Sequence, residues 1–168
     1  MTINPYLLVP FLALVALMQV TFAPLLAVLG VKPDLMLLVV VAWALLRGGD
    51  EGVIWAFVGG LWLDLFSGGP FGVNALALLA VSILAGWSEL TVFQAYILLP
   101  VVVATLATGV YGLILLFLLR ILGQPVVWSE SIMRVILPSM VLNALFMPLV
   151  FWTIRKLHQL AGRDQMDW

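Results

Sequence analysis

The sequence predicts an all-α, polytopic membrane helix bundle with six transmembrane helices. Hydrophobic residues make up 65% of the 168 residues and charged residues 9%, whereas soluble domains are about half apolar and a quarter charged. No charged residue occurs between Glu89 and Arg120, and a spanning helix needs about 20 apolar residues. Because no segment alternates with the period of a strand, the spanning pieces are expected to be helices, which pair their own backbone groups.

Turn-forming and charged residues divide the chain into six apolar segments, which we expect to form a single integral membrane domain. The first segment follows an N-terminus without basic residues, so we expect a retained helix and not a removable signal peptide. The expected spans are about 6–29, 33–47, 51–66, 72–87, 93–119 and 132–154, followed by a water-exposed tail at 155–168.

The second and third segments are short for a bilayer. The apolar part of the second, residues 35–46, rises about 18 Å at 1.5 Å per residue, against a hydrocarbon core of about 30 Å. These segments could form a re-entrant hairpin, or they could span as short helices with Arg47 reaching the interface and the bilayer thinned locally. We favour spanning, because residues 33–47 and 51–66 each reach about 22–24 Å.

The distribution of Lys and Arg near the span ends predicts the orientation. Arg155 and Lys156 directly follow the last expected span, which favours both termini, and the tail at 155–168, in the cytoplasm. With this orientation the inner side holds four basic residues and the outer side three: Arg47, Arg155, Lys156 and Arg163 against Lys32, Arg120 and Arg134.

Two helices carry stripes of small residues. Residues four apart share a helix face, and small residues let helices approach closely in lipid. These stripes could pack inside the chain, which is the commoner use, or one could receive a helix of another protein. The stripe of the third segment is Gly52, Ala56 and Gly60, ending in Asp64, and that of the fifth is Ala104, Thr108 and Gly112, flanked by Thr105 and Gly109.

Asp64 is the one carboxylate within the apolar part of an expected span, and such residues are rare and usually face a partner, a cavity or the bundle interior. A functional role would be a site for a proton, a substrate or a partner's cation. A structural role would be to cap or orient the glycine-rich turn at 67–72, and this is the role we favour slightly. An ion pair with Arg120 or Arg134 would agree with either role.

The remaining polar residues indicate no catalytic, metal or cofactor site. The chain lacks cysteine, and its single histidine, His158, lies in the expected tail, where we expect it to be solvated. We therefore predict no enzyme, and a net charge of −1 gives no electrostatic basis for binding nucleic acid. Gln19, Asn74 and Asn143 are expected to form hydrogen bonds between helices, and Pro138 and Pro148 to kink the last one.

The central part of the sequence resembles the MreD family of bacterial rod shape-determining membrane proteins. The resemblance covers about residues 32–80 and rests on Pro33-Asp34, on the run from Gly60 to Gly68 that reads Gly-Leu-Trp-Leu-Asp-Leu-Phe-Ser-Gly, and on the following Gly72-Val-Asn-Ala-Leu. It implies that the signature positions are Gly60, Asp64, Gly68 and Gly72, with Asn74 in the same turn. It also implies a six-helix fold similar to the substrate-binding components of ECF vitamin transporters.

The resemblance further implies a place in the plasma (inner) membrane and a role in cell elongation. MreD-like proteins associate with MreC and, through it, with MreB filaments and with RodA and its transpeptidase, which build peptidoglycan. Our first hypothesis is a scaffold that binds the transmembrane helix of MreC within the membrane lipid. The alternative is a membrane protein that binds a small molecule or a lipid-linked precursor, in an outward cavity for which Asp64, Asn74 and Arg134 are the candidate lining residues.

Overall fold

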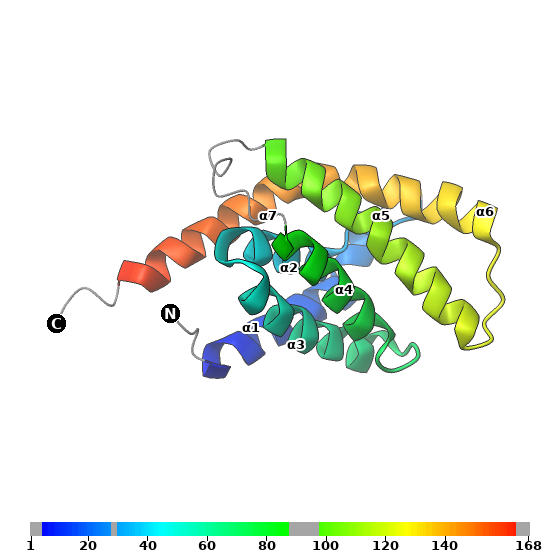
Figure 1. The fold of residues 1–168 in the computed structure, drawn as a ribbon, viewed down its shortest axis with the longest axis horizontal. Helices are drawn as coiled ribbons and strands as arrows, with labels where there is room; N and C mark the ends of the chain where they lie inside the picture. The colour runs from blue at the N-terminus through cyan, green and yellow to red at the C-terminus, as the bar shows by residue number, and fades with distance from the viewer. Residues whose placement is uncertain (1–4, 28–29, 88–97, 164–168) are drawn as a thin grey trace.

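The structure is a computed structural model that describes residues 5–27, 30–87 and 98–163, with side chains for 8–27, 30–86 and 98–159. Over these ranges the chain is all-helical, and its helices gather into one bundle (Figure 1). Five helices are separate, and a sixth is built from three consecutive pieces. The elements are α1 (Pro5–Thr21), the 3₁₀ turn η1 (Ala23–Leu26), α2 (Leu35–Arg47), α3 (Gly49–Ser67), α4 (Val73–Trp87), α5 (Leu98–Ile121), and then the continuous α6 (Trp128–Ser131), η2 (Ile132–Ile136) and α7 (Leu137–Arg163).

The number of helices agrees with the sequence prediction, but several of the boundaries differ. The first helix was expected to reach residue 29 and instead ends at Thr21, because Pro24 cannot continue the backbone ladder and the chain turns through η1. The third begins at Gly49, two residues earlier than expected. The expected start of the fifth, at residue 93, lies outside the described residues.

The last helix is much longer than the expected span of 132–154. It begins at Trp128 and runs without a break to Arg163, so residues 155–163 of the expected tail are helical. Ile154 is buried and His158, one turn later, is half-buried with its ring 5.8 Å from that of Trp43. This contact keeps the helix packed on α2, and the expectation that His158 is fully solvated was wrong.

The two prolines of the last helix are accommodated differently. Pro138 follows the π-helical turn η2, which is one of the recognised ways in which a helix adjusts to an interruption of its hydrogen-bond ladder. Pro148 lies inside α7, which continues past it. The helix therefore passes both positions without ending.

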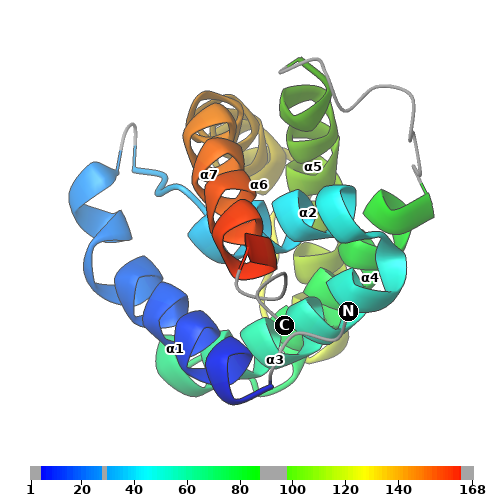
Figure 2. The same ribbon diagram turned by 90° about the vertical axis from the view of Figure 1, so that its left-hand side faces the viewer.

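The shortest of the main helices, α2, is the centre of the bundle. Nine consecutive residues from Met36 to Ala44 are buried, and α2 packs against α1, α3, α4, α5 and α7 (Figure 2). At its end, Trp43 stacks on Trp55 of α3 with a ring separation of 4.0 Å. Because every face of α2 is covered by protein, its continuous apolar sequence reflects the core of a bundle and not a surface in contact with lipid.

Two helices in the described part of the chain are long and apolar enough to cross a bilayer by length and composition: Leu98–Ile121, with 24 residues, and Trp128–Gln159, with 32. Both long helices extend beyond the shorter ones (Figure 1). The end of α5 and the start of α6 project on one side of the bundle, and the last turns of α7 project on the other. The other apolar helices are shorter, and α2 has only 13 residues. The bundle is thus a set of short helices packed against two long ones.

We predict that Gly60→Ala destabilises the protein while the matched change Gly109→Ala does not. A Cβ at Gly60 would lie 2.8 Å from the backbone nitrogen of Ala75, so α3 and α4 would have to separate, whereas a Cβ at Gly109 would lie 3.4 Å from the flexible side chain of Met140. Overpacking of this kind costs about 1–3 kcal/mol. Unfolding of both purified variants in detergent measures the difference, and equal stabilities would contradict this account of the α3–α4 contact.

Candidate functional site

Asp64, near the end of α3, holds the first turn of α4. Its Oδ2 accepts hydrogen bonds from the backbone N–H groups of Gly72 and Ala75 at 2.9 and 3.2 Å. Its Oδ1 accepts from the backbone and side-chain nitrogens of Asn74 at 3.0 and 2.9 Å. The first N–H groups of a helix have no partner within the helix, and a carboxylate beside them is favoured by the helix dipole. Asp64 therefore acts as a buried cap for α4.

The glycines of this turn are required by its geometry. Gly68, which ends α3, has φ +67°, and Gly72, which precedes α4, has φ +90°. Residues with a side chain rarely adopt this left-handed conformation. The structure thus brings Asp64, Gly68, Gly72 and Asn74 together in one turn, and the hydrogen bonds agree with the structural role considered for Asp64.

The ion pairs considered for Asp64 are not formed. Arg134 pairs with Glu130 of α6 at 2.9 Å, with both side chains largely exposed. Arg120 is exposed at the end of α5. The polar partner that does reach this region is Tyr111 of α5, whose hydroxyl donates to Asn74 Oδ1 at 2.8 Å. The turn is therefore tied to α5 through an amide and not through an ion pair.

A second buried network holds the start of α2, and the sequence analysis did not single it out. Asp34 caps the helix and accepts from Leu37 N at 3.4 Å and from Gln19 Nε2 at 2.8 Å. Gln19 Oε1 in turn accepts from Met36 N at 2.6 Å. The signal was present, because an aspartate directly before an apolar run is a typical N-cap. No local pattern indicated that α1 would supply a second cap.

The same network extends to the two long helices. Asn143 of α7 accepts from Asp34 N at 2.9 Å and donates to Thr108 Oγ1 of α5 at 3.1 Å. Thr108 is ten residues from the start of α5 and thirteen from its end, so the start of α2 lies level with the middle of α5. The hydrogen bonds between helices predicted for Gln19, Asn74 and Asn143 are thereby confirmed. Taken alone, α2 covers only about half the length of α5.

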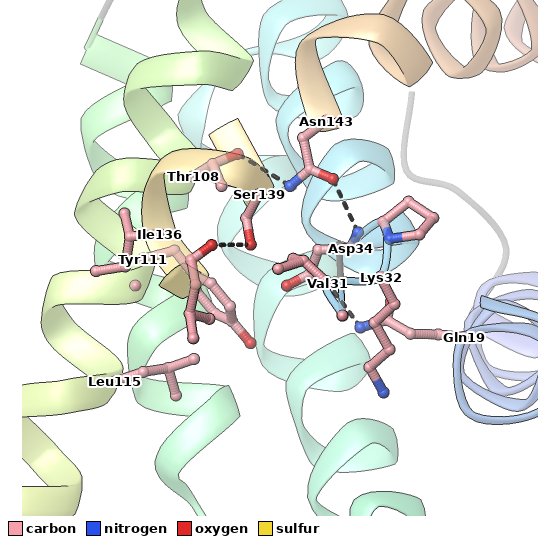
Figure 3. A pocket seen from close by; sticks show the side chains of 14 residues that line it. Gln19, Val31, Lys32, Asp34, Thr108, Tyr111, Leu115, Ile136, Ser139 and Asn143 are labelled. Atoms are coloured by element: carbon pink, nitrogen blue, oxygen red, sulfur yellow. Dashed lines mark hydrogen bonds between the residues drawn. The ribbon is translucent and has the colours of Figure 1, made fainter. Parts of the chain in front are cut away.

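A pocket of about 300 Å³ lies beside this network, between the 30–34 loop, α5 and the η2–α7 region (Figure 3). Apolar groups such as Val31, Leu115 and Ile136 form much of its wall. The polar residues that line it are Gln19, Lys32, Asp34, Thr108, Tyr111, Ser139 and Asn143. Asp64, Asn74 and Arg134, the residues considered for an outward cavity, do not line this pocket.

The small-residue stripe of α3 is covered by helices of the same chain. A Cβ at Gly52 would meet Ala44 of α2 at 2.7 Å and Ser82 of α4 at 2.8 Å. Ala56 is fully buried, and Gly60 lies against Ala75 of α4. This stripe packs within the chain and offers no groove to a partner helix.

The stripe of α5 is covered as well. Ala104 and Thr108 are buried, and a Cβ at Gly112 would meet Ile136 at 2.8 Å. Gly109 lies against Met140 of α7. The contacts of both stripes agree with the first of the two uses considered, packing inside the chain, because each contact surface holds the chain's own helices together.

The fold and these two networks define a bundle of apolar helices whose buried polar groups serve the starts of its own helices. Among the described residues, no group of three or more His, Cys, Asp or Glu side chains is placed to hold a metal ion. The arrangement is that of an apolar helix bundle, with two helices long and apolar enough to cross a membrane.

The family model described as rod shape-determining protein MreD matches residues 1–160. The chain therefore belongs to the MreD family, whose members are membrane proteins that determine bacterial cell shape, and the resemblance drawn from the sequence is confirmed. Comparisons with curated proteins and with solved structures give no match. The likeness to vitamin-transporter components thus stays a prediction.

We predict that Asp64→Leu destabilises the protein by at least about 2 kcal/mol. The change leaves several buried N–H donors at the start of α4 without an acceptor, and each such group costs about 1–3 kcal/mol. Asp64→Asn keeps one oxygen and should cost less, and Asp50→Asn, at an exposed position, should be neutral. Unfolding in detergent measures all three, and a fully stable Asp64→Leu variant would refute the capping role.

Proposed function

We propose that this protein is a membrane scaffold of the cell-elongation complex that binds the transmembrane helix of MreC and so helps to position peptidoglycan synthesis. The observation that carries the proposal is the MreD family match over residues 1–160. Links to MreB, RodA and its transpeptidase would then be indirect, through MreC. The buried polar groups of the two networks, around Asp34 and Asp64, are engaged in holding helices, which suits a scaffold.

The outer faces of the long helices offer the surface that such a partner needs. In the most apolar window of each long helix, only 22% of the residues are buried within the chain. Exposed leucines such as Leu17 on α1, Leu106 on α5 and Leu145 on α7 face away from the core in different directions. In lipid, helices associate by packing and not by the hydrophobic effect, so we infer that MreC uses one of these outer faces and not a small-residue groove.

We predict that a photo-crosslinking residue at one of Leu17, Leu106 or Leu145 captures MreC in intact membranes. One face should crosslink strongly and the opposite faces weakly, because a single helix covers one side of the bundle. The matched control is MreC carrying an unrelated apolar transmembrane helix, which should not be captured. Failure of all three positions, with both proteins present at normal levels, would contradict the scaffold proposal.

We also propose that the chain is a multi-pass protein of the inner membrane with both termini in the cytoplasm. The basic residues Arg155 and Lys156 are exposed near the C-terminal end of the last helix. Arg47 lies near the same end, because His158 of that helix packs against Trp43, which is one turn before Arg47 in α2. The short α6 and the residues before it lie at the opposite end (Figure 1).

We predict that single cysteines report this orientation, since the chain has none of its own. Gln124→Cys and Ser129→Cys, both at exposed positions between α5 and α7, should react with an impermeant maleimide from outside the inner membrane. Gln159→Cys should react only after the membrane is permeabilised. The reverse pattern would overturn the proposed orientation.

A further inference from the structure

The pocket beside the start of α2 presents mainly hydrogen-bond acceptors to whatever enters it. Three hydroxyl groups on its wall have already donated their protons. Tyr111 donates to Asn74 Oδ1, Ser139 to the carbonyl of Val135 at 2.7 Å, and Thr108 to the carbonyl of Ala104 at 2.7 Å. Each hydroxyl can therefore only accept a further hydrogen bond.

The Asp34 carboxylate adds a charged acceptor to the same wall. Its Oδ1 takes both of its hydrogen bonds, from Gln19 and Leu37. Its Oδ2 has no hydrogen-bond partner among the residues that the structure describes. Figure 3 shows Tyr111 on the α5 side of the pocket and Asp34 across from it, at the start of α2. Asp34 is half-buried and lines the pocket, and a free carboxylate oxygen together with lone pairs on neighbouring hydroxyls is suited to a group that carries N–H donors and positive charge.

The mouth of the pocket carries a charge of the opposite sign. Lys32 lies two residues before Asp34 in the loop that forms one wall, and its side chain is exposed. It forms no ion pair with any residue in the described ranges. A simple cation would be repelled by Lys32 on its way to Asp34, whereas a molecule that carries an anionic group next to its ammonium group would complement both residues.

We propose that this pocket binds a compact zwitterion, with its ammonium group on Asp34, its anionic group toward Lys32 and its carbon atoms against Val31, Leu115 and Ile136. A volume of about 300 Å³ suits a small ligand of this kind. An ethanolamine phospholipid headgroup and a free amino compound share this chemistry. The lining of this pocket contains none of Leu17, Leu106 and Leu145, so the proposal is tested independently of the scaffold role.

The soluble probe for this proposal is O-phosphoethanolamine, titrated against the purified full-length protein by a calorimetric or thermal-shift assay. Ethanolamine and glycerol 3-phosphate, which carry one charged group each, serve as matched partial ligands and should bind at least tenfold more weakly. A second arm uses a short-chain phosphatidylethanolamine, with the corresponding phosphatidylglycerol as its control. If the soluble probe binds, a free amino compound is sufficient to occupy the pocket. If only the phosphatidylethanolamine binds, the ligand is a phospholipid headgroup.

Variants of the two charged residues make the test specific. Asp34→Asn should weaken binding about tenfold, the effect of losing one charge-assisted hydrogen bond, and Lys32→Gln should weaken phosphoethanolamine binding several-fold without weakening ethanolamine binding. Asp50→Asn and Arg120→Gln, exposed and remote from the pocket, are the controls. Because Lys32 is exposed, its variant tests the site even if Asp34→Asn fails to fold. The proposal is overturned if neither probe binds at millimolar concentration, or if binding is unchanged in Lys32→Gln and in a folded Asp34→Asn.

Discussion

The backbone N–H groups at the start of a helix need hydrogen-bond acceptors. In this protein the starts of α2 and α4 receive those acceptors from side chains and not from water. The first turn of α2 lies level with the middle of α5, inside an apolar bundle. The first turn of α4 lies against a buried carboxylate. An unpaired polar group in such surroundings costs several kcal/mol. The chain meets this requirement with Asp34 and Gln19 at one start and with Asp64 at the other, and the positions of the remaining helices follow from these contacts.

Each cap also connects helices that are distant in the sequence. Asp34 and its neighbours join α1, α2, α5 and α7, while Asp64 and Asn74 join α3, α4 and α5. Since lipid gives helices little hydrophobic reason to associate, such hydrogen bonds and close glycine contacts determine which helix lies against which. The pocket beside α2 follows from this arrangement. Because α2 is short and starts halfway along α5, space is left unfilled next to its first turn.

The sequence predicted the all-helical class, the six helices and the interhelical roles of Gln19, Asn74 and Asn143, because hydropathy and isolated polar residues carry that information locally. It predicted the geometry around Asp64 less directly, from a carboxylate followed by glycines at the end of an apolar segment. It did not reveal that α2 is the buried centre, because a run of valine and leucine is equally compatible with a helix surrounded by protein and with a helix surrounded by lipid. It did not reveal the pocket beside α2, because the partners of Asp34 come from positions 15 and 109 residues away.

The most direct test of this account is amide hydrogen exchange in lipid nanodiscs, read at the first-turn N–H groups of α2 and α4. If the two carboxylate networks hold these helix starts, the amides of Met36, Asn74 and Ala75 exchange slowly, at rates comparable with those in the middle of α5. If these amides exchange as fast as those of Val126 and Val127 between α5 and α6, the helix starts are open to water, and the account of how the bundle is held together is wrong.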